Sequence, residues 1–160
     1  MNLRVRWSWY KWGMAVKFSS HCVYQIRYHL VMGVKYRNQM LRRKAYQETL
    51  VAWLREIGKR YWYEIEEVGS DGDHVHIFVG AAGRWAPSRI MQVLKSLSAR
   101  EMFRAHPEIR KTLWGGEFWS DGGYIGTVGG GTTEEIVRKY IQRQGSPSEK
   151  ALYGQLVLFR

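Results

Sequence analysis

The chain alternates between stretches whose apolar residues have the spacing of strands and stretches with the spacing of helices. Residues 22–36 (CVYQIRYHLVMGVKY) are rich in β-branched and aromatic side chains, which predicts a long strand. Residues 42–60 predict a helix, because their apolar side chains recur at i, i+3, i+4 and i+7 and form one buried stripe. This stripe consists of Leu50, Trp53, Leu54 and Ile57.

The next two apolar runs predict a pair of adjacent strands. They cover residues 61–69 (YWYEIEEVG) and 74–80 (HVHIFVG). The polar turn of residues 70–73 lies between them, so we expect the two strands to form a hairpin. A second helix is expected to begin at Pro87 and to end near Arg104, because proline is favoured in the first turn of a helix.

The last part of the chain predicts a strand followed by a helix. Residues 117–128 (EFWSDGGYIGTV) predict the strand, with an interruption at its two glycines. The glycine loop 129–131 leads into a helix over residues 132–144, whose start matches a capping box formed by Thr132 and Glu135. The helix is expected to stop at the glycine and proline that follow it.

The predicted order of elements is β-α-β-β-α-β-α. It indicates an α+β fold of ferredoxin-like type, an antiparallel sheet with helices on one face. The chain of 160 residues suits one compact domain. We expect a basic N-terminal arm over residues 1–20, the domain proper over 21–145, and a tail over 146–160.

The charge balance indicates a polyanionic partner. Lysine and arginine number 25 against 14 acidic residues, which gives a formal net charge of +11. Nucleic acid is the usual partner of such a surface, although solubility alone or an acidic membrane surface would also account for the charge. The chain also contains 8 Trp, 10 Tyr and 5 Phe, and aromatic faces among basic side chains suit the unpaired bases of a single strand.

Several classes of protein are excluded by what the sequence lacks. Cys22 is the only cysteine, which excludes an intrachain disulfide and a cysteine-rich zinc site. We expect Cys22 to be a small buried residue in a protein of the reducing cytoplasm. No apolar run reaches the ~20 residues that cross a bilayer, and no Gly-x-x-x-x-Gly-Lys phosphate loop indicates a nucleotide cofactor.

Two histidines stand at the start of the strand predicted over residues 74–80. Because strand side chains alternate, His74 and His76 point to the same face, about 7 Å apart. Neutral imidazole is a common metal ligand, and Asp73 is a candidate acceptor for the N–H of an imidazole whose other nitrogen binds the metal. The alternative is that the two histidines are hydrogen-bonded surface residues and Asp73 is a turn residue.

The last helix carries a second group of unusual residues. Val137, Tyr140, Ile141 and Gln144 follow helical spacing and lie on one face. The two aliphatic residues are expected to dock the helix, whereas the phenol and the amide oxygen can face a common point. A hard divalent cation would accept that oxygen beside two imidazoles. Otherwise Tyr140 is a partly buried tyrosine and Gln144 belongs to a fraying helix end.

At this point the sequence resembles a known family, the HUH (His-hydrophobic-His) single-tyrosine transposases of the smallest bacterial and archaeal insertion sequences. The resemblance rests on DHVHIFVG (73–80) on a strand and RKYIQRQ (138–144) on a late helix. YHLVMGVKYR (28–37), SRIMQVLKSLSAREMF (88–103) and LWGGEFWS (113–120) also match the family pattern. In all, the resemblance spans roughly residues 20–145.

The resemblance implies roles for particular residues. His74, His76 and Gln144 would be ligands of Mg²⁺ or Mn²⁺, and Tyr140 would be the nucleophile. The protein would bind subterminal DNA hairpins as a homodimer. It would then cleave and rejoin single-stranded DNA at insertion-sequence ends through a 5′-phosphotyrosine, with the loop 129–131 letting the tyrosine helix swing.

Basic residues outside this group are candidates for phosphate contacts. Ten of them lie within the region of resemblance, and their contribution should make DNA binding fall steeply with salt. Each of the ten also has an ordinary reading as a solvated surface residue. They are Lys35, Arg37, Arg42, Arg43, Lys95, Arg100, Arg104, Arg138, Lys139 and Arg143.

Four other functions remain open at this point. A domesticated relative would use the same chemistry on scattered palindromic repeats. A rolling-circle initiator or conjugative relaxase usually carries a further domain, for which this chain has no room. A non-catalytic hairpin-binding protein would not need Tyr140, and a metal-dependent nuclease would leave free 5′-phosphate ends without a protein–DNA adduct.

Overall fold

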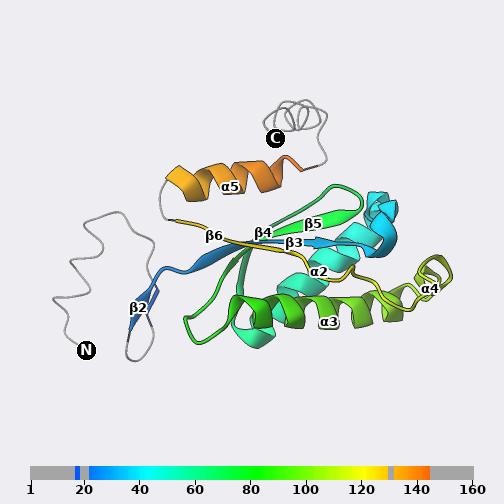
Figure 1. Cartoon of the computed structure of the whole chain (residues 1–160), viewed down its shortest axis with the longest axis horizontal. Helices are drawn as coiled ribbons and strands as arrows, with labels where there is room; N and C mark the ends of the chain where they lie inside the picture. Colours follow the sequence, from blue (N-terminus) through cyan, green and yellow to red (C-terminus); the bar gives the residue numbers. More distant parts are fainter. Residues whose placement is uncertain (1–16, 19–21, 130–131, 145–160) are drawn as a thin grey trace.

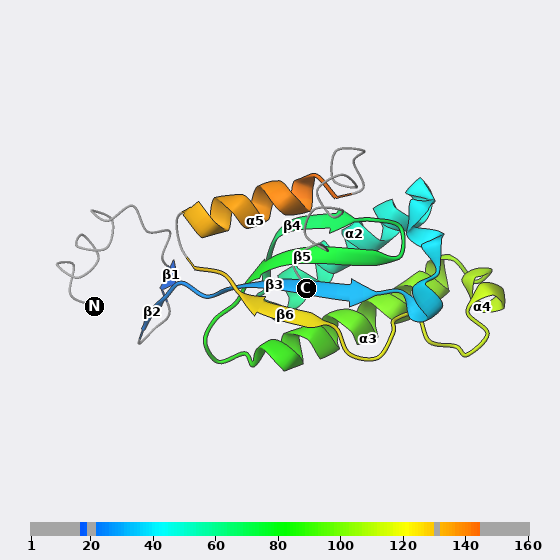
Figure 2. The same ribbon diagram turned by 45° about the horizontal axis from the view of Figure 1, so that its top comes forward.

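The computed structural model describes residues 17–18, 22–129 and 132–144. Its main sheet has four strands in the order β4-β5-β3-β6, and every neighbouring pair is antiparallel (Figures 1 and 2). The strands are β3 (Arg27–Gly33), β4 (Glu64–Ser70), β5 (His74–Gly80) and β6 (Tyr124–Thr127). The expected tail and most of the expected N-terminal arm lie outside the described residues.

Helices connect the strands in the expected order. Helix α2 (Lys44–Tyr61) joins β3 to β4, and α3 (Pro87–Ala105) joins β5 to β6. This connectivity and strand order are those of a ferredoxin-like α+β fold, so the predicted antiparallel α+β architecture is confirmed. None of the helices in the described part of the chain combines the length and apolarity needed to span a membrane.

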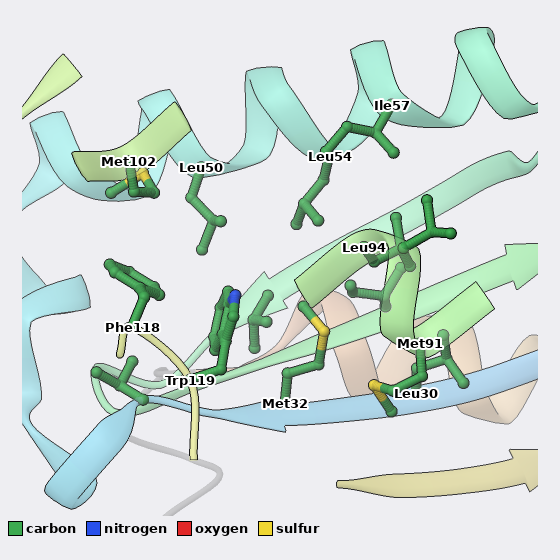
Figure 3. Close-up of a cluster of buried hydrophobic side chains, with 14 of the residues drawn as sticks. Leu30, Met32, Leu50, Leu54, Ile57, Met91, Leu94, Met102, Phe118 and Trp119 are labelled. Carbon is green, nitrogen blue, oxygen red and sulfur yellow. The ribbon is translucent and has the colours of Figure 1, made fainter. Parts of the chain in front are cut away.

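The main hydrophobic core lies between the sheet and the layer formed by α2 and α3 (Figure 3). Leu30 and Met32 of β3 meet Leu54 of α2 and Leu94 of α3, and all four are fully buried. Of the predicted stripe on α2, Leu50, Leu54 and Ile57 are buried. Trp53 is half-buried, with the Arg104 guanidinium carbon 5.3 Å from its ring centroid.

Helix α5 (Thr132–Gln142) lies on the opposite face of the sheet, against β4 and β5 (Figures 1 and 2). A second, smaller cluster forms there from Phe78, Val128 and Ile141, with Val137 and Tyr140 packed against it. The expectation of helices on one face therefore holds for α2 and α3 only. Strand alternation explains the arrangement, because Ile77 and Val79 point into the main core while Phe78 points toward α5.

The strand expected over residues 22–36 is divided in the structure. A short strand, β2 (Val23–Tyr24), pairs with β1 (Lys17–Phe18), and β3 follows after a break. The chain then turns through the short 3₁₀ helices η1 (Lys35–Arg37) and η2 (Gln39–Arg42). The prediction was too long because residues 36 and 37 adopt positive φ angles, which no propensity for strands indicates.

The fourth strand is shorter than expected. It begins at Tyr124, after the expected interruption at Gly122 and Gly123, both of which have positive φ angles; Trp119 contributes one isolated bridge to Val34. The short helix α4 (Ile109–Thr112) was not predicted. Cys22 is exposed rather than buried, because it precedes β2 at the margin of the sheet.

Candidate functional site

His74 and His76 lie on the face of β5 that is turned toward α5. Both belong to a strand with a neighbour on each side, so the backbone that carries them is held by two hydrogen-bonded ladders. The two ring centroids are 4.9 Å apart. His76 is only 3% exposed, and the ring of Tyr140 lies 5.4 Å from its ring. The structure therefore brings together three of the residues that the sequence singled out.

A third histidine, His29 of β3, completes this cluster. Its Nε2 lies 2.8 Å from Nδ1 of His76, and the two rings are stacked with centroids 5.1 Å apart. Because Nδ1 of His76 takes part in this hydrogen bond, Nε2 is the nitrogen left to face the site. That Nε2 is buried, and no described residue forms a hydrogen bond with it. A buried polar atom without a partner is expected where a ligand binds.

Sequence reasoning did not select His29 as a site residue. The strand YHLVMG was recognised, but nothing in its own pattern says which residue of β5 His29 will meet. The register does so: His29 pairs across the ladder with Phe78, which places it diagonally next to His76. Once the pairing of the two strands is known, the alternation of their side chains indicates that His29 and His76 lie on the same face.

Asp73 supports the other histidine. Its Oδ1 accepts a hydrogen bond from Nδ1 of His74 at 2.5 Å, which leaves Nε2 of His74 as the nitrogen available to a ligand. Its Oδ2 lies 3.0 Å from Nε of Arg37. The carboxylate is thus held from both sides and orients the imidazole, as the partners of metal-bound histidines usually do.

Both imidazoles of the His29–His76 pair are kept neutral. Burial lowers the pKa of His76 to about 3, and the nearby His74 and His29 act in the same direction. Burial also lowers the pKa of His29. At neutral pH both rings are therefore uncharged, and neutral imidazole is the form that binds metals.

Helix α5 presents Tyr140 to the histidines. Ile141 is buried and Val137 is partly buried against Phe78, which confirms the two expected docking residues. Tyr140 is half-buried, and its ring lies edge-on to His76 and also 6.1 Å from His29. The phenol therefore reaches the histidine cluster from the same chain.

Gln144 follows the last turn of α5 and lies over Gly69 of β4. A Cβ placed on Gly69 would be 3.1 Å from Cβ of Gln144, and Gly69 pairs directly with His76 across the ladder. Since directly opposed side chains share a face, Gln144 stands beside the His76 position. No cluster of three or more His, Cys, Asp or Glu within the described residues is arranged to hold a metal. The imidazoles of His74 and His76 and the amide oxygen of Gln144 are nevertheless ligand types that suit a divalent cation.

A network of ion pairs holds α5 on the sheet. Glu66 lies at a bulge in β4 and receives Arg138 of α5 and Arg27 of β3, the latter at 2.9 Å. Glu134 of α5 also contacts both arginines, at 2.9 Å from Arg138 and 3.3 Å from Arg27. The guanidinium carbon of Arg138 lies 4.9 Å from the ring centroid of Phe78. The four charged side chains fix the helix beside the site and are named here the α5 latch. They are Arg27, Glu66, Glu134 and Arg138.

Several of the candidate phosphate contacts have partners within the protein. The ammonium of Lys95 donates to the carbonyl oxygens of Ser120 and Gly122 at 2.6 Å, and burial lowers its pKa. Lys35 pairs with Glu117 and Asp121.

Other candidates also have partners on their own helix or lie in the layer away from the histidines. Arg100 and Arg104 flank the buried Glu101 on α3, on the far side of the sheet from the histidines. Lys139 pairs with Glu135 one turn back, and Arg43 donates to Tyr46 Oη at 3.1 Å. Arg42 and Arg143 are exposed, so their assignment as phosphate contacts stays a prediction.

Comparison with known proteins identifies the family. The model of the family "Transposase IS200 like" matches residues 22–144. The ISDra2 transposase TnpA of Deinococcus radiodurans is 38% identical over 122 residues, which cover 76% of this chain and 86% of the relative. The transposase for insertion sequence element IS200 of Salmonella typhimurium is 26% identical over 128 residues, covering 80% and 82% of the two chains.

Solved structures give the same result. A Deinococcus radiodurans R1 protein assigned as a transposase is 31% identical, with a TM-score of 0.66 over 80% of this chain and 97% of that one. The REP-associated tyrosine transposase bound to a REP hairpin shares the fold, with a TM-score of 0.55 over 79% of this chain and 70% of that one at 13% identity. The resemblance drawn from the two sequence motifs is confirmed, and this chain belongs to the IS200-like transposase family of DNA strand transferases.

Proposed function

We propose that this protein cleaves and rejoins single-stranded DNA at the ends of an insertion sequence, with Tyr140 as the nucleophile. The observation that carries the proposal is the position of the Tyr140 ring 5.4 Å from His76, whose buried Nε2 has no hydrogen-bond partner among the described residues. A phenol beside a coordinating nitrogen is the arrangement that attack on a metal-bound phosphate requires.

His74, His76 and Gln144 would hold the cation, Mg²⁺ or Mn²⁺. The bound cation would neutralise charge on a phosphate oxygen and orient the phosphodiester. His29 and Asp73 would fix the two imidazoles through the hydrogen bonds at their Nδ1 atoms, at 2.8 Å and 2.5 Å. These supports matter because a ligand that cannot rotate keeps its lone pair on the site.

The reaction consists of two balanced transfers. The phenol oxygen of Tyr140 forms a bond to phosphorus, and the bond from phosphorus to the 3′ oxygen breaks, leaving a 5′-phosphotyrosine and a 3′-hydroxyl. A second 3′-hydroxyl then attacks the phosphotyrosine, which restores a phosphodiester and the free phenol. One P–O bond is exchanged for another in each step, so the cycle needs no nucleotide cofactor.

DNA hairpins at the ends of the element would be the recognised substrate, and a homodimer the active form. The net charge of +11 supports a DNA partner, and the shared fold includes a relative whose structure holds a REP hairpin. Strand β6 lies at one margin of the sheet with Ile125 exposed, which supports an interface between two copies. Residues 21–145 would form the catalytic unit.

A second candidate substrate is a family of scattered palindromic repeats rather than the two ends of one element. The fold match to the REP-associated tyrosine transposase favours it. The chemistry would be identical, and the surroundings of the gene would decide between the two. Flanking hairpins on both sides of the coding region would indicate transposition.

The proposal is tested by incubating the protein and Mn²⁺ with a labelled single-stranded hairpin from its own locus and resolving the products under denaturing conditions. Wild-type protein is expected to give a covalent adduct, and Tyr140→Phe none. Tyr124→Phe is the matched control, because the ring of Tyr124 also lies near the cluster, 5.7 Å from His29. Free 5′-phosphate ends without an adduct would support the nuclease instead, and hairpin binding that never leads to cleavage would support the binding protein.

A further inference from the structure

Two large aromatic rings are stacked on the surface at one end of the sheet. Tyr36 of η1 and Trp114, which follows α4, have ring centroids 5.5 Å apart and planes only 9° from parallel. Tyr36 is 51% exposed and Trp114 is 81% exposed. A tryptophan that exposed buries little apolar area, so it contributes little to the stability of the fold.

The backbone that presents Tyr36 is strained. Tyr36 and Arg37 both have left-handed φ angles, 59° and 52°, although neither is glycine. Strained residues persist only where the surrounding structure fixes them, and they gather at binding sites. Here the turn is held by the backbone hydrogen bonds from Lys35 N to Phe118 O, at 2.9 Å, and from Arg37 N to Val34 O, at 3.0 Å.

The other half of the pair is also fixed. The buried side chains of Ile109 and Leu113 anchor α4, and backbone hydrogen bonds of 2.9 Å run from Leu113 to Ile109 and from Gly116 to Leu113. Gly115 leaves room for the partner ring, because a Cβ there would lie 2.9 Å from the Tyr36 hydroxyl. The backbone on both sides of Trp114 is therefore fixed by buried side chains and by hydrogen bonds.

We propose that the stacked pair Tyr36–Trp114, named here the aromatic platform, binds an unpaired base of the DNA substrate. The inference rests on the proposed function in taking single-stranded DNA as the ligand. Every nucleobase has a π face that stacks on tyrosine and tryptophan, whereas the bases of a duplex are already stacked on each other. Cations beside the platform suit the phosphates of the same nucleotides: Arg37 is 69% exposed, and exposed Lys111 lies one turn before Trp114.

The platform lies at the end of the sheet that carries His74. Arg37, next to Tyr36 in the chain, contacts Asp73, and Asp73 accepts a hydrogen bond from His74. The backbone N–H of Val34 also donates to the carbonyl oxygen of Asp73 at 2.7 Å. Figure 2 shows η1, α4 and the start of β5 at the same end of the sheet. A strand that enters the histidine site from this end passes the platform.

The test compares the binding of two labelled DNA probes to wild-type protein, Trp114→Ala and Trp114→Phe. One probe is a hairpin with a short single-stranded flank, and the other is the same molecule with the flank annealed to its complement. Trp62→Ala is the matched control, because Trp62 is 78% exposed but lies beside Arg27 and Gly80, at the opposite end of β3 and β5. Trp114→Ala is expected to weaken binding of the flanked hairpin by about 5- to 150-fold, the usual effect of losing one stacked base.

Three further results are expected from the same experiment. Trp114→Phe should restore most of the affinity, and Trp62→Ala should bind as wild type does. The dependence of binding on salt should keep its slope in Trp114→Ala, because no phosphate contact is lost. A single abasic nucleotide at the stacking position of the flank should weaken wild-type binding as much as Trp114→Ala weakens binding of the intact probe. Trp114→Ala should bind this abasic probe no more weakly than wild type does.

The platform is refuted if Trp114→Ala binds the flanked hairpin like wild type, or if it loses the same affinity for the fully annealed probe. Adducts at Tyr140 are measured in parallel to separate the two proposals. Adduct formation by wild type together with unchanged binding by Trp114→Ala overturns the platform alone. A wild-type protein that neither binds the probe nor forms an adduct overturns the proposed function as well.

Discussion

His29 Nε2 lies 2.8 Å from His76 Nδ1, so two imidazoles from neighbouring strands are joined by one hydrogen bond inside the candidate site. The two residues do not face each other directly in the ladder, since His29 pairs with Phe78 and His76 with Val31. The diagonal contact orients the ring of His76 and leaves its buried Nε2 without a hydrogen-bond partner among the described residues.

Removing this hydrogen bond should weaken the metal site. His29→Phe keeps a ring of similar size but removes the partner of His76, and the affinity for Mn²⁺ is expected to fall by about 10- to 100-fold. Equilibrium titration with Mn²⁺, followed by its paramagnetic resonance signal, measures the change without DNA. His106→Asn serves as the control, because His106 bonds Thr49 between α2 and α3, in the layer away from the site. Equal Mn²⁺ affinity in His29→Phe and wild type would show that His29 does not support the site.

Gly69 allows α5 to lie close to the sheet. A Cβ at this position would overlap the carbonyl oxygen of Ile141, so Gly69→Ala must lift the helix that carries Tyr140. We expect adduct formation to slow by about 100-fold, since small misplacements of a reacting group have effects of that size.

Gly33→Ala is the matched control for this substitution. Gly33 pairs with His74 as Gly69 pairs with His76, but a Cβ on Gly33 would approach no atom closer than 3.8 Å. Gly33→Ala should therefore react as wild type does. Equal rates of adduct formation by Gly69→Ala and Gly33→Ala would mean that the close packing of α5 on β4 is not needed for the reaction.

The α5 latch should contribute to stability as well as to position. Glu66→Ala leaves the buried Arg27 without one of its two acidic partners, and we expect the free energy of unfolding to fall by about 3 kcal/mol, as when other buried ion pairs are broken. Glu64→Ala on the same strand removes only a half-exposed pair with Lys17 and should change it by less than about 1 kcal/mol. Urea denaturation of both variants decides this, and similar losses would argue against the latch.

The salt dependence of hairpin binding should distinguish basic residues that contact DNA phosphates from basic residues that are bonded within the protein. Arg143 is exposed at the end of α5, and Arg143→Gln is expected to lower the slope of log K against log salt by about 1. Lys95→Gln should leave the slope unchanged, because its ammonium is bonded to the carbonyl oxygens of Ser120 and Gly122. Fluorescence anisotropy over a series of salt concentrations measures both slopes. A lower slope for Lys95→Gln alone would reverse the two assignments.

The sequence correctly predicted the bounds of those elements whose own residues determine where they begin and end. The strand over residues 74–80 was bounded correctly, because its apolar run is framed by a polar turn and by Gly80 and is buried on both faces. Helix α3 likewise began at Pro87, as the first-turn preference of proline indicates.

Features that depend on contacts between segments far apart in the chain could not be predicted from local sequence patterns. The contact of His29 with His76 follows from the register of two strands 47 residues apart in the chain. The placement of α5 on the second face of the sheet follows from the docking of Ile141 and Val137 on Phe78. The left-handed turn at Tyr36 and Arg37 is imposed by contacts to residues 117–120 and Asp73, so the local sequence carries no sign of it.

The most direct test of the central claim is to locate the attachment of DNA on the protein by mass spectrometry. Wild-type protein is incubated with Mn²⁺ and the hairpin, the attached DNA is trimmed with nuclease, and the protein is digested to peptides. The account predicts that the peptide containing Tyr140 carries the mass of a phosphate-linked nucleotide while the peptide containing Tyr124 does not. Attachment at Tyr124, or cleaved DNA with no nucleotide on any peptide, would contradict it.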